Sequence, residues 1–208
     1  SWIDGPKTSL NDKIVRPASD PFKDSGGLRE LKGNLGRSVM KVSAVASENH
    51  FIEAPARIFE TQDAVKEAFK SGEFTEDTVV VVRFQGPKAN GMPELHSLTP
   101  ILSVLLSRGL KVALVTDGRM SGASGKVPSA IHLSPEGADG GPIAKLRDGD
   151  LVRVDAGSGT LECLEAGFEM REPVVPDLSG NQDGLGRELF AAFRDRCGLA
   201  ADGAGTVV

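Results

Sequence analysis

The sequence has no tyrosine, one tryptophan and only two cysteines, Cys163 and Cys197. The cysteines form no Cys-x-x-Cys pair, and no histidine ligand pattern lies near them. A structural zinc site and a disulfide framework are therefore disfavoured, and we interpret both residues as buried thiols.

The sequence also lacks a long apolar run, a basic leader and a surplus of positive charge. No apolar segment approaches the roughly 20 residues that cross a bilayer, and the first residues show no basic stretch followed by an apolar core. The net charge of −5 argues against a broad surface for nucleic acid or an acidic membrane. We therefore expect a cytoplasmic protein with neither nucleic acid nor membrane as a partner. Because the chain begins at Ser1, we also expect it to be a piece of a longer protein.

Glycine is abundant, with 25 residues beside 12 prolines. This composition is typical of a loop-rich α/β or β-dominated domain and not of a helical bundle. In the middle of the chain, strand patterns and helix patterns alternate. Strands are predicted at 39–45, 52–59, 78–82, 111–115, 130–133, 151–155 and 160–164, and helices at 61–72, 97–108 and 142–146.

This alternation predicts an α/β domain whose mixed sheet is partly closed. We expect an extended arm or linker at 1–32, the folded domain at 33–172, and a connector, terminal helix and loose tail at 173–208. The terminal helix is predicted at 185–197. Its apolar residues Leu189, Phe190 and Phe193 are expected to face inward.

Two loops that follow predicted strands gather polar side chains, and ligands of open α/β sheets bind at such strand ends. The side chains of the first loop, at 83–96, include Arg83, Lys88, Asn90, Glu94 and His96. A carboxylate such as Glu94 can bind a hard cation or accept a proton, and it can equally cap the following helix.

The second loop, at 116–126, contains three glycines. Glycine lets the backbone approach a ligand, and exposed N–H groups bind phosphate or carboxylate oxygens. Arg119 and Lys126 add charged donors, and Ser121 and Ser124 add hydroxyl groups. A nucleotide-binding phosphate loop is disfavoured, because neither serine nor threonine follows Lys126. A tight turn without a ligand stays an open alternative.

Several motifs, in their order along the chain, resemble the dihydroxy-acid dehydratase and 6-phosphogluconate dehydratase family. They are GNLGR at 33–37, IEAPA at 52–56, RFQGP at 83–87 with GMPE at 91–94, VTDGRMSGA at 115–123, and SPE at 134–136 with GGP at 140–142. The segments at 34–37, 85–96 and 121–126 are similar to the phosphogluconate branch of the family in particular.

The resemblance implies a swivelling β/β/α barrel-like carboxy-terminal domain with a mixed sheet and flanking helices. It also implies a hydro-lyase that removes water from a 2,3-dihydroxy acid. For the phosphogluconate branch, this is the Entner–Doudoroff step from 6-phospho-D-gluconate to 2-keto-3-deoxy-6-phosphogluconate. An iron–sulfur cluster, expected to be 4Fe-4S, acts there as a Lewis acid and is held by an amino-terminal domain. Two isolated cysteines cannot hold a cluster, so we expect no cluster ligand in this chain and no activity from the chain alone.

By the same resemblance, Ser121 matches the family's serine base, and Glu94 matches a carboxylate of a divalent-metal site, for example for Mg²⁺. A serine acts as a base only as an alkoxide, which a metal and N–H groups stabilise. Arg119, Ser124 and Lys126 are expected to contact the carboxylate or phosphate of the substrate, with loop stabilisation as the alternative. The implied partners are the amino-terminal domain, a phosphorylated sugar acid and a second copy in a homodimer.

Other functions stay open at this point. A dihydroxy-acid or other sugar-acid dehydratase would differ only in its substrate. A non-catalytic phosphosugar-binding module or an interface module would use the same loops without any reaction.

Overall fold

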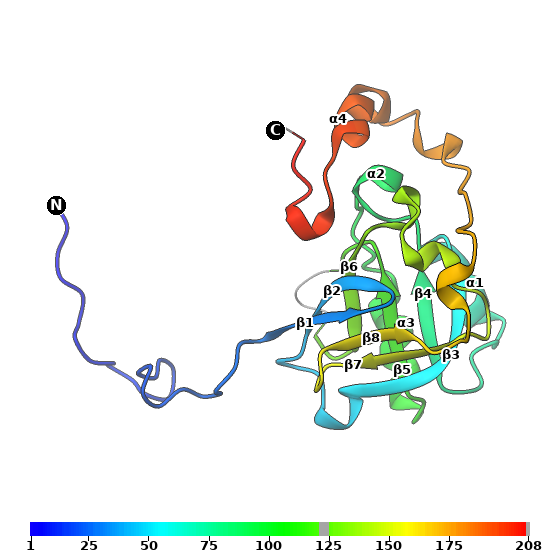
Figure 1. Cartoon of the computed structure of the whole chain (residues 1–208). Coiled ribbons are helices and arrows are strands. Elements are labelled where there is room, and N and C mark those ends of the chain that lie inside the picture. Colours follow the sequence, from blue (N-terminus) through cyan, green and yellow to red (C-terminus); the bar gives the residue numbers. More distant parts are fainter. Residues whose placement is uncertain (121–124, 207–208) are drawn as a thin grey trace.

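The computed structural model describes residues 1–120 and 125–206. In these residues, eight strands form one closed barrel in the order β1-β2-β6-β5-β4-β3-β7-β8 (Figure 1). The strands are β1 (Leu28–Gly33), β2 (Gly36–Lys41), β3 (Phe51–Phe59), β4 (Thr78–Val82), β5 (Val112–Thr116), β6 (Ser129–Ser134), β7 (Leu151–Asp155) and β8 (Thr160–Cys163). The α-helices are α1 (Gln62–Lys70), α2 (Pro87–Asn90), α3 (Leu98–Ser107) and α4 (Ala191–Arg196). The short 3-10 helices are η1 (Ser47–Asn49), η2 (Gly137–Asp139), η3 (Pro142–Lys145), η4 (Phe168–Met170), η5 (Ser179–Asn181), η6 (Arg187–Phe190) and η7 (Ala200–Asp202).

The sheet is mixed, as the sequence predicts for an α/β barrel-like domain. Strands β3, β4, β5 and β6 run parallel to their neighbours, and β2 and β7 pair antiparallel at the two sides of this group. Strand β3 pairs with β7 up to Pro55 and with β4 from Ala56. Proline lacks the N–H that a ladder needs, and here it lies at the change of partner.

Strands β4 and β5 are buried along their whole length, and for β4 the continuous β-branched run at 78–82 favours such burial on both faces. Alternate residues belong to two different apolar clusters. Val79, Val81, Ala113 and Val115 lie in the cluster that fills the barrel, and Val80, Val82, Val112 and Leu114 lie in the outer layer under α1 and α3. Packing on both faces therefore fixes the position of the carboxyl ends of β4 and β5.

Helices α1 and α3 form where the sequence predicts them. Thr61 caps α1, because its Oγ1 accepts a hydrogen bond from Ala64 N at 3.1 Å. The outer cluster takes Val65 and Ala68 from α1 and Leu102 and Leu105 from α3. These two helices therefore cover the parallel part of the barrel.

The first two strands of the barrel differ from what the sequence predicts. Strand β1 is not predicted, because Leu31 is its only buried residue. The strand expected at 39–45 is β2, which ends at Lys41. The barrel takes in β1, although the expected arm extends to residue 32, and the arm before Leu28 runs away from the barrel (Figure 1). The division at 32 and 172 stays a prediction.

The single terminal helix predicted at 185–197 is wrong. Gly184, Leu185 and Gly186 all have positive φ, so the helix cannot start there, and the chain forms η6 followed by the short α4. Leu189, Phe190 and Phe193, expected inside, are exposed. The buried residues are instead Arg194, whose guanidinium donates to Arg187 O at 2.9 Å, and Cys197.

Within the described residues, no helix combines the length and the apolar character that crossing a membrane requires.

Candidate functional site

The candidate site lies on the carboxyl rim, by which we mean the loops that follow β4, β5 and β6. These three strands are neighbours and run in the same direction, so their carboxyl ends meet at one end of the barrel. In Figure 1 this is the end near α2. Both loops that the sequence singles out belong to this rim, as does the segment after β6 that begins with Pro135.

Asp117 joins all three loops of the rim. Its side chain is completely buried directly after β5. Oδ1 accepts a hydrogen bond from Gln85 N at 2.9 Å, and Oδ2 accepts from Phe84 N at 3.1 Å and from Gly137 N at 2.9 Å. Burial raises the pKa of the Asp117 carboxyl, and the N–H donors lower it in part. The carboxylate therefore fixes where the loops after β4 and β6 begin.

A second buried carboxylate, Glu136, holds α2 in place. Its oxygens accept hydrogen bonds from Lys88 N at 3.1 Å and from Ala89 N at 2.8 Å. Burial raises the pKa of Glu136, and these N–H groups counteract it. The carboxylate lies so close to Gly86 that a Cβ there would be only 2.4 Å from Glu136 Oε2. Only glycine fits at residue 86 without displacing this contact.

Glu94 and Arg119, two of the predicted site residues, lie side by side. They form an isolated parallel bridge in which Leu95 N donates to Arg119 O at 3.0 Å. Arg119 Nη1 is 3.8 Å from Glu94 Oε2, and Arg119 Nε donates to Met92 O at 2.8 Å. Both side chains are more than one third exposed, so their ion pair contributes little to stability and both groups remain open to a ligand.

His132 lies on the side of Gly118 and Arg119 that is opposite to Glu94. Its N–H donates to Gly118 O at 2.9 Å, and its φ of 56° is in the left-handed region. The register between β2 and β6 shifts here, so His132 is the extra residue of a β-bulge. Burial and the charge of Arg119 lower the pKa of the half-buried imidazole. A non-glycine residue in this conformation costs about 1 kcal/mol or more.

Backbone strain gathers on this rim. Phe84 with φ 62° and Met92 with φ 56° are, like His132, non-glycine residues in the left-handed region. Phe84 follows β4 and donates to Asp117, and Met92 accepts from Arg119. Such conformations persist where the surrounding structure imposes them, and they cluster at functional sites.

The remaining predicted site residues are not brought into this arrangement by any described contact. Lys126 is exposed, two positions before Pro128. Ser121, predicted as the base, and Ser124, predicted to bind substrate, lie outside the described residues. The ends of their loop are nevertheless positioned, because Asp117 anchors one end and Gly125 is buried at the other.

Other polar residues of the first loop serve the structure. Arg83 donates to Leu146 O at 3.2 Å and to Glu60 Oε1 at 3.0 Å, and its guanidinium lies over the Phe84 ring. Lys88 Nζ pairs with Asp139 at 2.7 Å. These contacts tie the loop to its neighbours and leave Glu94 as its open carboxylate near Arg119.

The described residues do not form a metal or cluster site by themselves. In ranges 1–120 and 125–206, no three His, Cys, Asp or Glu side chains group as metal ligands do. Cys163 lies in the barrel core and Cys197 in the C-terminal segment, and burial raises the pKa of both thiols. Buried, protonated single thiols do not fit an iron–sulfur cluster. Glu94 supplies one carboxylate, which is too few for a divalent cation without further ligands.

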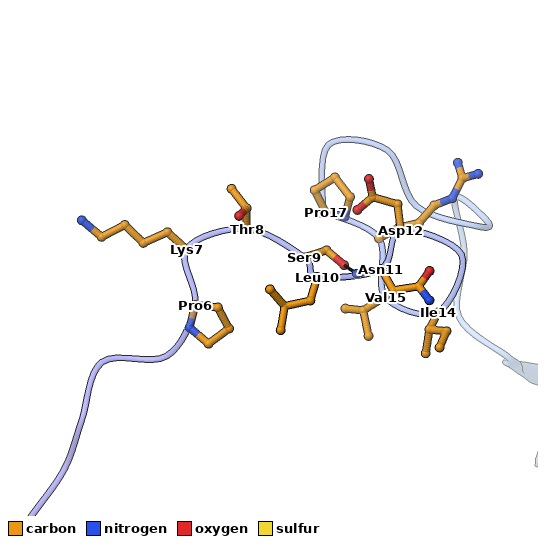
Figure 2. Close-up of a pocket in the computed structure, with 11 residues that line it drawn as sticks. Pro6, Lys7, Thr8, Ser9, Leu10, Asn11, Asp12, Ile14, Val15 and Pro17 are labelled. Atoms are coloured by element: carbon orange, nitrogen blue, oxygen red, sulfur yellow. Dashed lines mark hydrogen bonds between the residues drawn. The ribbon is translucent and has the colours of Figure 1, made fainter.

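Two hollows lie away from the Arg119 group. One of about 750 Å³ is open to solvent and lined by the arm between Pro6 and Pro17 alone (Figure 2), and because no barrel residue lines it, it carries no argument for a site. Another of about 390 Å³ lies beside the rim, where Gln85 and Asn90 face Asn181 and Arg187.

Sequence reasoning gave no role to Asp117, Glu136 or His132. The position of Asp117 directly after a fully buried strand was a usable signal, since strand ends carry site residues. Glu136 lies in the SPE motif at 134–136, but the local pattern gives neither Glu136 nor His132 a role, because their roles depend on contacts with distant loops.

Comparison with known proteins agrees with the motifs. Residues 13–204 match the family described as dihydroxy-acid/6-phosphogluconate dehydratase, C-terminal. The chain is 59% identical to the phosphogluconate dehydratase of Pseudomonas aeruginosa and 56% identical to that of Escherichia coli K12, in each case over 98% of the chain. It is 42% identical, over 82% of its length, to a dihydroxy-acid dehydratase of Halothermothrix orenii.

The chain spans about a third of the length of these relatives, 34% for the first two and 32% for the third. The family match covers far more than half of the chain, and it includes the barrel and every described residue of the carboxyl rim. This chain therefore belongs to the dihydroxy-acid/6-phosphogluconate dehydratase C-terminal family.

Proposed function

We propose that this chain is the C-terminal domain of a phosphogluconate dehydratase. The complete enzyme removes water from 6-phospho-D-gluconate and forms 2-keto-3-deoxy-6-phosphogluconate. The observation that carries the proposal is the identity of 53–59% to phosphogluconate dehydratases over 93–98% of the chain, against 42% to a dihydroxy-acid dehydratase.

The carboxyl rim is suited to part of this reaction. Loss of water requires removal of the weakly acidic C2 proton and stabilisation of the negative charge that develops on the substrate. Ser121 is the proposed base, two positions after Arg119, in the loop that Asp117 anchors. Arg119, Ser124 and Lys126 are the proposed contacts for the carboxylate or phosphate of the substrate.

The metal chemistry is proposed to come from outside this chain. An iron–sulfur cluster, proposed as 4Fe-4S, has no ligand set among the described residues, so we assign its ligands to an amino-terminal region of the same protein. Glu94 is proposed to contribute one carboxylate to a divalent cation such as Mg²⁺, with the other ligands from that region. Arg119 and Glu94 are both partly exposed, which leaves them open to such a partner.

The proposal includes two macromolecular partners. One is the amino-terminal region, and the other is a second copy of the full-length protein in a homodimer. The exposed apolar side chains of Trp2 and Ile14 in the arm, and of Leu189 and Phe190 in the C-terminal segment, are available for these contacts. A cytoplasmic location is also part of the proposal.

The decisive experiment is turnover of the full-length protein on 6-phosphogluconate, gluconate and dihydroxyisovalerate, with 2-keto acid as the measured product. We expect the largest kcat/KM for 6-phosphogluconate. A clear preference for dihydroxyisovalerate would support the second candidate, a dihydroxy-acid dehydratase, to one of which the chain is 42% identical. A preference for gluconate would indicate a dehydratase of unphosphorylated sugar acids.

The 208-residue chain provides the matched control. We expect it to show no turnover and no iron-dependent visible absorption, because its described residues hold no cluster ligand set. Titration of this chain with 6-phosphogluconate tests the non-catalytic class: tight binding by the chain alone, together with an inactive full-length protein, would indicate a phosphosugar-binding module.

A further inference from the structure

The β-bulge of β6 places His132 beside Arg119, a predicted substrate-binding residue. The proposed function gives His132 itself no role. Gly118 and Arg119 lie between two neighbours, since Leu95 N donates to Arg119 O at 3.0 Å and His132 N donates to Gly118 O at 2.9 Å. Glu94 therefore flanks Arg119 on one side and His132 flanks it on the other. The imidazole is half-buried and lies within the electrostatic reach of the guanidinium.

The residue type at this position is informative. Glycine, or failing that asparagine, adopts a φ of 56° with the least strain, and neither is present. The hydrogen bond of His132 to Gly118 uses the backbone N–H, so it does not require an imidazole. The bulge therefore explains the backbone but not the choice of side chain, and backbone strain of this kind clusters at functional sites.

We propose that His132 is a further substrate-binding residue, whose imidazole N–H donates a hydrogen bond to the anionic group that Arg119 binds. This inference rests on the proposed function and assigns the sugar-acid carboxylate as the group shared by the two side chains. A carboxylate has two oxygens and about four acceptor positions, so it can accept from a guanidinium and an imidazole together.

Burial, and then the charge of Arg119, lower the pKa of His132, and this shift favours the neutral imidazole that suits this role. The nearby positive charge is that of Arg119, and η7, which packs against β6, carries Asp202. A neutral imidazole still offers one N–H donor, and it does not compete with Arg119 for Glu94 as a second cation would. In this arrangement Arg119 supplies the positive charge that attracts the anionic group, and the N–H of His132 supplies a directional hydrogen bond that orients it.

The test compares variants of the full-length enzyme. His132→Gly removes the imidazole and relieves the positive φ, so a loss of function cannot be attributed to new backbone strain. His132→Asn keeps an N–H donor on a residue that tolerates this φ. The matched control is Leu185→Gly, which relieves a φ of 54° at a fully exposed residue of the C-terminal segment. Thermal unfolding verifies that each variant is folded.

We expect the KM for 6-phosphogluconate to rise about tenfold in His132→Gly, with a much smaller change in kcat, and to recover in part in His132→Asn. The Leu185→Gly control should match the wild type. A folded His132→Gly enzyme with the KM of the wild type would overturn the proposal. A fall in kcat alone, in step with lowered stability, would also overturn it by indicating a structural role.

The two proposals can fail separately. If the wild-type enzyme dehydrates none of the three acids, the proposed function is wrong, and calorimetric titration with 6-phosphogluconate then tests His132 by itself. Weaker binding by His132→Gly than by the wild type would support the residue's role. Equal binding, or no binding by either protein, would refute it.

Discussion

The carboxylate of Asp117 joins the loops after β4, β5 and β6, so its replacement tests how the rim is built. Asp117→Asn preserves the shape of the side chain, but an amide offers one acceptor oxygen instead of two. With the amide oxygen at the Oδ2 position, Phe84 N and Gly137 N keep their acceptor, and Gln85 N faces an NH₂ group. At least one hydrogen bond from a buried N–H to a charged oxygen is lost.

The magnitude follows from these contacts. A hydrogen bond to a charged group contributes roughly 1.5–3 kcal/mol, and a buried donor without a partner costs a similar amount. Removing the buried charge offsets part of the loss, because burial already raises the pKa of Asp117. We therefore expect a net destabilisation of about 2 kcal/mol, which for a chain of this length lowers Tm by about 4–8 °C.

Thermal and urea unfolding of the 208-residue chain provide the assay. Asp195→Asn, at an exposed position of α4, is the matched control and should change stability by less than about 0.5 kcal/mol. In the full-length protein, Asp117→Asn should also lower turnover, because the loop that carries Arg119 and Ser121 loses part of its connection to the loops after β4 and β6. A Tm of Asp117→Asn equal to that of the wild type would refute the view that this carboxylate holds the rim together.

Three further predictions address single residues. Ser121→Ala in the full-length protein should lower turnover by orders of magnitude while the visible absorption of the proposed iron–sulfur cluster is retained, and near-wild-type turnover would remove Ser121 from the mechanism. Gly86→Ala should destabilise the chain by about 1–3 kcal/mol in urea unfolding, because the new Cβ overlaps the Glu136 carboxylate, whereas Gly180→Ala, with open space around it, should have little effect. Burial and Arg119 lower the pKa of His132 below its ordinary 6.5, so the unfolded chain binds a proton that the folded chain does not, and stability falls as the pH drops from about 6.5 towards the folded pKa. His132→Asn should flatten this fall, and an unchanged pH profile of unfolding would show that His132 does not contribute to it.

Most of the secondary structure is predictable because it is encoded locally. The β-branched run of β4 and the apolar spacings of α1 and α3 are read directly from the sequence, and the structure confirms them. Strand β1 escapes prediction because its pairing with β2 and β8, and not its own apolar content, makes it a strand. The prediction of one terminal helix at 185–197 is wrong for a different reason. This segment does show the apolar spacing of a helix, but α1 and α3 already cover the outer layer of the barrel, and the glycines before the segment bend the chain.

In the candidate site, too, some features follow from the local sequence and others do not. The sequence places Arg119 and Glu94 in two loops, and the rule on strand ends predicts that these loops meet. The bridge between the two residues agrees with that rule. The roles of Ser121 and Ser124 stay predictions from the family resemblance, since both lie outside the described residues.

The sequence by itself determined the family, the mixed α/β character and the two loops that form the rim, because motifs and hydrophobic periodicity are properties of short segments. Closure of the barrel, burial of Asp117 and Glu136 under backbone N–H groups, and the position of His132 beside Arg119 were decided only by the tertiary structure. The reason is physical. Each of these features depends on a contact between residues far apart in the chain, and a local pattern carries no record of which distant group will supply the hydrogen bond or the charge.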